Sequence, residues 1–196
     1  MVIRSTLSQP RAGGYLEGQL LVATTLITES CFNRAVLYIC AHGDDGAMGV
    51  IINHVLPELN YSEVLEQLEI DYSSNFIEPT VYMGGPVESS RGLVVHSHDY
   101  SHSDTVHLTG EISITSNLQV LRDISEGNGP KKHLLTLGYS GWAPGQLEAE
   151  VEANSWISVP ATSALIFDTD DDKKWNSAAQ SLGIDMLKLS GDVGHA

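Results

Sequence analysis

The sequence is short of cysteines and of basic residues. Its 196 residues include two cysteines, Cys31 and Cys40, and 10 Lys and Arg against 25 Asp and Glu, which gives a formal charge of −15. Two cysteines are too few for a disulfide framework, and they lack the Cys-x-x-Cys spacing of a redox pair. We therefore expect buried, reduced thiols in a chain that is long enough to bury one hydrophobic core.

Basic residues are missing from long parts of the chain. No Lys or Arg occurs between Arg34 and Arg91, and none occurs between His133 and Asp172. Nucleic acids attract proteins largely through Lys and Arg placed on their phosphates, so the charge disfavours direct nucleic-acid binding. An unknown protein or small molecule is the expected partner. Acidic residues also keep a protein soluble without any partner.

Long apolar runs are absent as well. No run approaches the roughly 18 residues of a membrane-spanning helix, and the first residues lack the apolar stretch of a signal peptide. We expect a cytoplasmic protein with no membrane association. Residues 1–14 are predicted to form a flexible lead and residues 15–196 a single domain, because no linker, repeat or low-complexity tract interrupts the chain.

Patterns typical of strands and helices alternate along the sequence. Apolar runs predict strands over residues 18–27, 35–40, 48–53, 80–83, 92–96 and 133–139, and two further apolar runs cover 156–159 and 164–167. Helical patterns cover residues 61–69, 146–153 and 174–182. A fourth helical segment is expected to be capped by Ser116 and to stop at Gly127. The turn at 42–46 makes an early hairpin. This order predicts an α/β fold with a mixed sheet covered by helices.

Short motifs in a fixed order, many of them with glycine or tryptophan, carry a family resemblance. They are Gly18–Ala23, Phe32–Cys40, Gly46–Asn53, Tyr82–Val87, Arg91–His96, Gly127–Pro130, Leu137–Trp142, Gly145–Glu148, Asn154–Trp156, Phe167–Asp168, Trp175, Gly183–Asp185 and Gly194–Ala196. Together they resemble the bacterial AlgH/YqgE family. The resemblance implies a single compact domain with a mixed, partly barrel-like β-sheet surrounded by helices. It also implies a regulatory or interaction protein connected with transcription, in a family without agreed catalytic residues. Because the charge disfavours direct contact with DNA, we expect a non-enzymatic protein that acts indirectly in transcription, with no cofactor.

A glycine-rich segment is the first candidate binding site. Gly84 and Gly85 precede Ser89, Ser90 and Arg91 between two expected strands, so backbone N–H groups and a guanidinium could hold an anion. The segment Gly84–Arg91 then predicts an alternative function, an enzyme or sensor for a small anionic metabolite. The other interpretation is a turn that needs glycine and no ligand.

Ser140 is the second candidate. It lies in Gly138-Tyr-Ser-Gly-Trp142, which differs from a Gly-x-Ser-x-Gly nucleophile elbow because the last position is tryptophan. Ser140 is therefore either a ligand-contacting serine near a tight turn or, with a histidine brought close by the fold, a nucleophile.

A histidine-rich stretch, expected to be a surface loop, is the third candidate. His96 and His98 would share one face of a strand, and imidazole with carboxylate suits zinc or nickel. The candidate metal ligands are His96, His98 and His102, with His107, Asp99 and Asp104 nearby in the sequence. The alternative is a set of surface histidines without a metal. The part of this stretch after His96 does not belong to the family resemblance, which assigns it no role.

Overall fold

A computed structural model describes residues 15–72 and 77–184, so the expected lead at residues 1–14 and the last family motif, Gly194–Ala196, lie outside the described residues. The strands are β1 (Gln19–Ala23), β2 (Val36–Gly43), β3 (Gly46–Ile51), β4 (Val81–Met83), β5 (Val87–Ser97), β6 (Val106–His107), β7 (Ile112–Thr115), β8 (His133–Trp142) and β9 (Trp156–Pro160). The predicted hairpin is confirmed as β2 and β3, which pair from Leu37 opposite Ile51 to the turn at Gly43 and Gly46.

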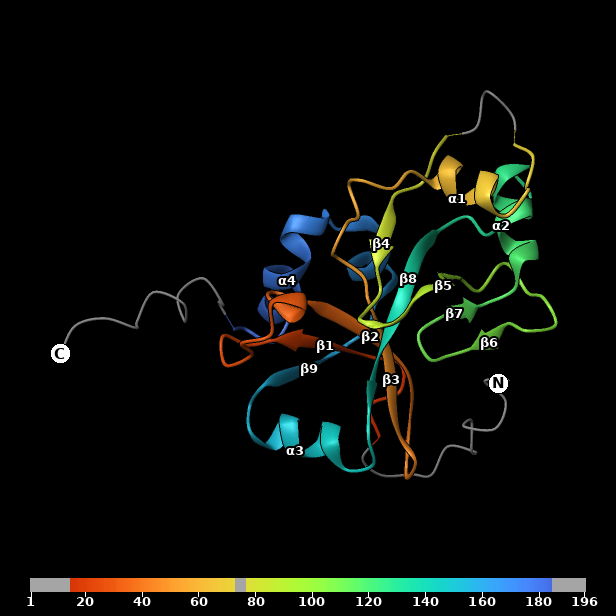
Figure 1. Ribbon diagram of the computed structural model, residues 1–196. Helices are drawn as coiled ribbons and strands as arrows, with labels where there is room; N and C mark the ends of the chain where they lie inside the picture. The colour runs from red at the N-terminus through yellow and green to blue at the C-terminus, as the bar shows by residue number, and fades with distance from the viewer. Residues whose placement is uncertain (1–14, 73–76, 185–196) are drawn as a thin grey trace.

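The helices cover the sheet at three places. They are α1 (Tyr61–Gln67), α2 (Leu118–Ser125), α3 (Gln146–Glu152) and α4 (Asp171–Gln180), with a 3-10 turn η2 (Ser30–Phe32) and a π-helical turn η3 (Ala164–Asp168). Figure 1 shows α1 and α2 together at the upper right, α3 at the bottom and α4 at the left of the sheet. The sheet is therefore enclosed by helices, as predicted.

Among the described residues, nine strands form one sheet. Their order is β6-β7-β5-β8-β3-β2-β1-β9, and β4 pairs with β8 beside this path. The β4–β8 pair is parallel, whereas the strands along the path pair in antiparallel fashion. The expected α/β fold with a mixed, partly barrel-like sheet is thus confirmed: the sheet curls around one apolar interior (Figure 1).

The curled sheet buries side chains on both of its faces. Strand residues on the inner face, among them Leu20, Tyr38, Val95 and Ile112, pack with Trp175 of α4. On the outer face, α3 covers the β1–β3 half, and α1 and α2 cover β4, β5 and β8. Alternate residues of each strand face these two layers, which explains why the strands are almost continuously apolar.

Several local predictions were wrong in their boundaries, most clearly those of β1, β5 and α2. The strand expected over 18–27 ends at Ala23. The strand expected at 92–96 begins at Val87, and its pairing with β8 is irregular between Val87 and Gly92. Helix α2 is capped by Asn117 rather than Ser116, because the Asn117 side chain accepts a hydrogen bond from the Gln119 N–H at 2.8 Å. Asn side chains are as good at this position as Ser, so the sequence alone did not separate the two neighbours.

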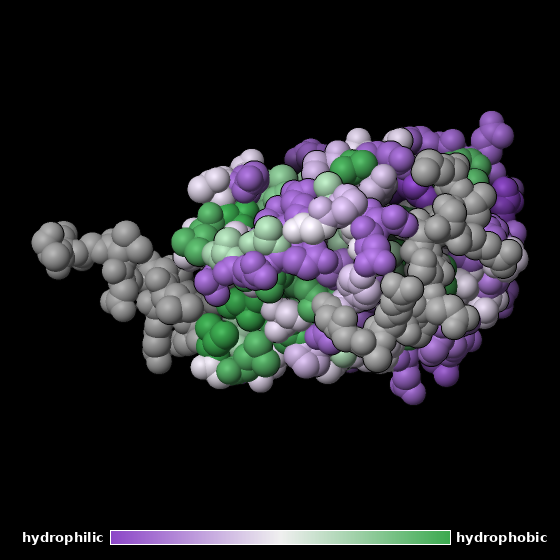
Figure 2. Space-filling model, turned by 90° about the horizontal axis from the view of Figure 1, so that it is seen from below, coloured by the Kyte–Doolittle hydropathy of each residue, from purple (hydrophilic) through white to green (hydrophobic). Residues whose placement is uncertain are grey.

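The surface carries both polar and apolar regions. Figure 2 shows a face with many hydrophilic residues and with hydrophobic residues gathered toward its left, the side on which α4 lies in Figure 1. No helix in the described part of the chain is both long enough and apolar enough to cross a membrane.

Candidate functional site

A pocket of about 250 Å³ opens between α1 and α2, above the outer face of β5 and β8. Its apolar walls include Val64 of α1, Leu68 just after it, Leu121 of α2, and Leu135 and Leu137 of β8. Leu118, which is 50% exposed, also lines it. At roughly 30 Å³ for each water in the liquid, this volume matches about eight water-sized groups. The pocket therefore suits a small molecule.

The polar part of the pocket is uncharged. It consists of Gln67, Ser90, Thr115, Ser116 and Asn117, and no Asp, Glu, Lys, Arg or His is among the lining residues. Although the chain carries a formal charge of −15, none of its charged side chains lines this pocket. Since burying an unpaired ion is costly, the pocket favours a neutral ligand.

Behind Thr115 lies a hydrogen-bonded chain of side chains. Thr115 ends β7 and is 1% exposed, and its Oγ1 lies 2.8 Å from His96 Nε2 and 2.8 Å from Thr105 Oγ1. Thr115 and Val94 are partners across β7 and β5, so His96, two residues after Val94, lies on the same face of the sheet as the pocket. His96 was expected in a surface loop but is fully buried in β5.

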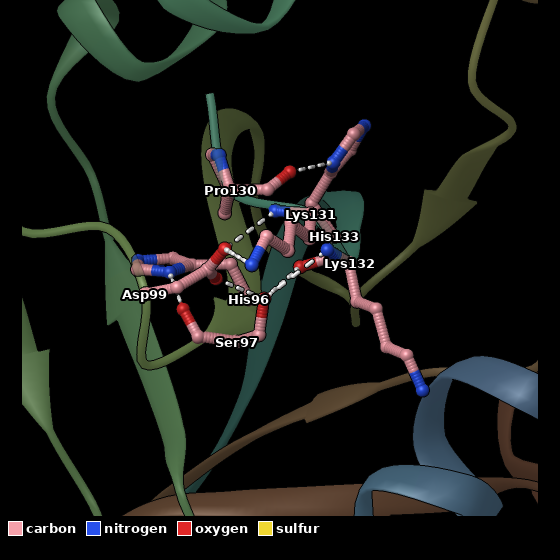
Figure 3. A network of polar contacts seen from close by, with 7 residues as sticks. All are labelled: His96, Ser97, Asp99, Pro130, Lys131, Lys132 and His133. Atoms are coloured by element: carbon pink, nitrogen blue, oxygen red, sulfur yellow. Dashed lines mark hydrogen bonds and ion pairs between the residues drawn. The ribbon is translucent and has the colours of Figure 1, made fainter. Parts of the chain in front are cut away.

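A polar network fixes the main chain beside His96 (Figure 3). The Ser97 N–H donates to the Lys132 carbonyl at 2.9 Å, and the Lys132 N–H donates to Ser97 Oγ at 3.1 Å. Ser97 Oγ donates to Asp99 Oδ1 at 2.5 Å, and Asp99 Oδ2 accepts from the Lys131 N–H at 3.3 Å. The Ser97 carbonyl, 2.8 Å from His96 Nδ1, is therefore held in place from several sides.

Buried and half-buried histidines should make stability depend on pH. Burial lowers the pKa of His54, His96 and His133, because it disfavours the charged ring. In the unfolded chain these groups titrate near about pH 6.5, so below that pH the unfolded state binds more protons than the native state. Stability is therefore highest above about pH 6.5 and falls as the pH drops, by up to about 1.4 kcal/mol per pH unit for each histidine.

Urea unfolding at about pH 7.5, 6.5 and 5.5 measures this dependence, in a range where carboxylates stay ionised. His133→Gln should flatten the slope, because it removes one of the rings whose pKa burial lowers. If the free energy of unfolding changed equally with pH in His133→Gln and in the parent protein, His133 would not contribute to the pH dependence.

Gly84 and Gly85 lie where the chain crosses β8. Since β4 and β5 both pair with residues 135–137 of β8, they occupy its opposite edges, and the link between them passes over the strand. A Cβ on Gly84 would lie 2.3 Å from the Gly138 carbonyl oxygen, and a Cβ on Gly85 would lie 2.2 Å from the Tyr139 carbonyl carbon. The Gly84 N–H already donates to the Leu137 carbonyl at 2.7 Å. This crossing explains the glycine pair without a ligand.

Ser89, Ser90 and Arg91 lie in the irregular part of β5. Arg91 Nη1 donates to Glu88 Oε2 at 3.0 Å, and the guanidinium lies 5.8 Å from the centre of the Tyr139 ring. The guanidinium is thus held by an acid and an aromatic ring of the same chain, and Ser90 lines the apolar pocket. Binding of an anion by this segment stays a prediction.

The surroundings of Ser140 and Cys40, as the described residues show them, do not activate either side chain as a nucleophile. Ser140 Oγ is buried in β8 with no hydrogen-bond partner among the described residues. Cys31 and Cys40 are free thiols, and burial raises the pKa of Cys40 to about 12. A thiol with so high a pKa is a poor nucleophile at neutral pH.

The histidine candidates have separate surroundings. His96 is hydrogen-bonded through both ring nitrogens, His98 packs against His107 with ring centres 4.2 Å apart, and His102 Nδ1 lies 3.2 Å from Asn117 Nδ2. Within residues 15–72 and 77–184, no group of three or more His, Cys, Asp and Glu side chains is placed to hold a metal ion. A metal site at His96, His98 and His102 therefore stays a prediction.

Comparison with known proteins gives the family. The AlgH-like family model matches residues 20–187, most of the chain. The chain belongs to the AlgH-like family. Similar relatives include the UPF0301 proteins of Methylocella silvestris, 42% identical over 94% of this chain and 93% of the relative, and of Rhizobium rhizogenes, 43% identical over 98% of both chains. The sequence resemblance is thus confirmed.

Solved structures agree with this AlgH-like fold. The solution structure of AlgH from Pseudomonas aeruginosa matches with a TM-score of 0.74 and 37% identity, over 97% of this chain and all of that one. The crystal structure of DIP2367 from Corynebacterium diphtheriae matches with a TM-score of 0.71 at 20% identity, over 95% of this chain and 97% of that one, which supports the fold alone.

Two charged groups of this AlgH-like chain, the half-buried Glu150 and the buried Lys174, were missed in the sequence. Glu150 Oε2 accepts hydrogen bonds from the indoles of Trp142 at 2.9 Å and Trp156 at 2.8 Å. Lys174, 2% exposed, donates to the Ile52 carbonyl at 3.0 Å and to Asp171 Oδ1 at 2.6 Å. Lys174 joins α4 to the segment just after β3, 122 residues away in the sequence, so no local spacing signals it. Glu150 joins α3 to the ends of β8 and β9 that flank this helix. Their role in the AlgH-like fold is to fix α3 and α4.

Proposed function

We propose that the protein is a non-enzymatic regulatory protein whose pocket between α1 and α2 binds a small, uncharged and largely apolar molecule. The uncharged lining carries this proposal, because an ionised metabolite would find no opposite charge there. Largely apolar pockets with a few polar groups are typical of small-molecule sites. The environments of Ser140 and Cys40 favour binding over nucleophilic catalysis.

The regulatory part of the proposal runs through a protein partner. A charge of −15 opposes direct contact with DNA, so an effect on transcription would be indirect. We place the protein in the cytoplasm, in keeping with the reading of its sequence. A ligand in the pocket would contact both α1 and α2, and binding could thus change the surface that these helices present.

The alternative, an anionic metabolite held by Gly84–Arg91, has less support. It needs a guanidinium and backbone N–H groups that are available to a ligand. Arg91 is paired with Glu88, and the Gly84 N–H is bonded within the sheet. We therefore keep the apolar pocket as the proposed site.

Calorimetric titration with octan-1-ol and octanoate tests the proposal. Octan-1-ol should bind with a Kd of about 10–100 μM, a range open to a ligand of roughly ten non-hydrogen atoms. Octanoate should bind at least about tenfold more weakly, because its carboxylate would be desolvated without a counter-charge.

A pair of matched valine variants locates the binding. A Cβ on Gly92, in the pocket wall, would lie 3.7 Å from Leu135 Cδ1, an ordinary contact, so Gly92→Val should fold and fill part of the pocket. Gly141→Val is the control, since its Cβ would lie 3.7 Å from the Tyr139 ring in the same sheet and outside the pocket. Gly92→Val should weaken octan-1-ol binding about tenfold or more, and Gly141→Val should not. Tighter binding of octanoate, or equal effects of the two variants, would contradict the proposal.

A further inference from the structure

The polar wall of the pocket contains the hydroxyl of Thr115, and what we infer from it rests on the function proposed above. The Thr115 hydroxyl lies between His96 Nε2 and Thr105 Oγ1, 2.8 Å from each. A hydroxyl has one proton to donate and two lone pairs that accept. Which of its neighbours receives that proton decides what Thr115 can offer to a ligand.

The hydrogen bonds of His96 determine which group donates and which accepts in the series of hydrogen bonds from His96 through Thr115 to Thr105. His96 Nδ1 lies 2.8 Å from the Ser97 carbonyl oxygen, which only accepts, so Nδ1 carries the ring proton. In a neutral ring Nε2 is then an acceptor, and Thr115 must donate its proton to it. Thr105 in turn donates to Thr115, and the His102 N–H donates to Thr105 Oγ1 at 2.8 Å. Thr115 therefore has no proton left for a ligand and one lone pair still available.

The surroundings of His96 keep this direction at neutral pH. Burial lowers the pKa of His96, the neighbouring His107 and His133 lower it further, and the Ser97 carbonyl and Asp99 oppose them. The ring of Tyr100, whose hydroxyl donates to Asp123, packs edge-on against His96 with centres 5.6 Å apart. The network of Ser97, Asp99 and Lys132 holds the accepting carbonyl (Figure 3). The imidazole thus stays neutral and fixed in one tautomer.

We propose that Thr115, held as an acceptor by His96, selects small apolar molecules that carry a hydrogen-bond donor, such as an alcohol or a primary amide. Thr115 touches the ligand, and His96 is a positioning residue that acts through it. A molecule of the same size with an ether or ester oxygen in place of the donor would face the Thr115 oxygen without a hydrogen bond. Specificity arises from that mismatch rather than from the shape of the apolar walls.

Octan-1-ol and its isomer 1-methoxyheptane form the test pair, because they differ in the O–H donor and little in apolar content. The parent protein should bind octan-1-ol about five- to tenfold more tightly, the usual effect of one hydrogen bond. Thr115→Val should remove this preference and leave binding of 1-methoxyheptane nearly unchanged. Thr115→Ser, which keeps the hydroxyl, should retain the preference and serves as the folded comparison if the valine variant is unstable.

The outcomes separate this inference from the proposed function. Equal binding of the two isomers by the parent protein, with Gly92→Val weakening both, overturns the role of Thr115 and leaves the pocket intact. Loss of the preference in Thr115→Ser also overturns it. Binding of neither isomer overturns the proposed function and this inference together.

Discussion

Gly85→Ala is expected to lower the free energy of unfolding by at least about 3 kcal/mol, enough to leave little folded protein in a domain of ordinary stability. The added Cβ would lie 2.2 Å from the carbonyl carbon of Tyr139 and 2.3 Å from its oxygen, distances at which the backbone has to move. That backbone belongs to β8, which pairs with β3, β4 and β5. A shift there would disturb the centre of the sheet, so the contact cannot relax locally.

Urea unfolding monitored by circular dichroism measures the loss, and Gly92→Ala is the matched control. A Cβ on Gly92 meets no atom closer than 3.7 Å, so this variant should keep stability within about 0.5 kcal/mol of the parent. If Gly85→Ala unfolded at the same urea concentration as Gly92→Ala, the crossing of the β4–β5 link over β8 would not be as tight as described.

Glu150→Ala is expected to cost about 2–4 kcal/mol of stability. One carboxylate oxygen accepts from the indoles of Trp142 and Trp156, and the other accepts from Gln146 Nε2 at 2.9 Å. Removing the side chain leaves two indole N–H groups without their acceptor in a largely buried place, and each such loss costs about 1–3 kcal/mol. The contact between α3 and the β8 and β9 ends would loosen.

Glu152→Ala is the control, because it removes an exposed acid two residues further along the same helix. It should change stability by less than about 0.5 kcal/mol. Thermal unfolding combined with tryptophan fluorescence separates the variants, since the emission of Trp142 and Trp156 should shift in the native state of Glu150→Ala alone. Equal stability of the two variants would contradict the role given to Glu150.

Local signals in the sequence predicted local structure well. The helix predicted over 61–69 forms as α1, with Glu63 accepting from the Asn60 N–H at 2.8 Å at its start. Helix α2 stops beside Gly127 as predicted, and the φ of that glycine is +79°. The turn after β2 closed a hairpin in the expected place. Each of these features depends on residues a few positions apart, which is why periodicity and turn chemistry were sufficient.

Features that join distant segments could not be predicted in this way. Gly84 and Gly85 looked like an anion-binding loop in the sequence. The backbone atoms that leave no room for a side chain there belong to β8, more than 50 residues later, so the sequence around the glycines does not show them. His96 looked like a surface histidine, yet Thr115 and the chain around Lys132 bury it. The pocket has no sequence motif at all, since its apolar residues are ordinary core residues on two helices and two strands. Only the fold brings them together.

The most direct test of the account is an NMR titration of the amide-labelled protein with octan-1-ol. The account predicts saturable shifts concentrated at the pocket, on Val94, Thr115, Leu121 and Leu135, which vanish in Gly92→Val and persist in Gly141→Val. Shifts that are centred away from α1 and α2, or that do not saturate, would show that the pocket is not a binding site and would contradict the proposed function.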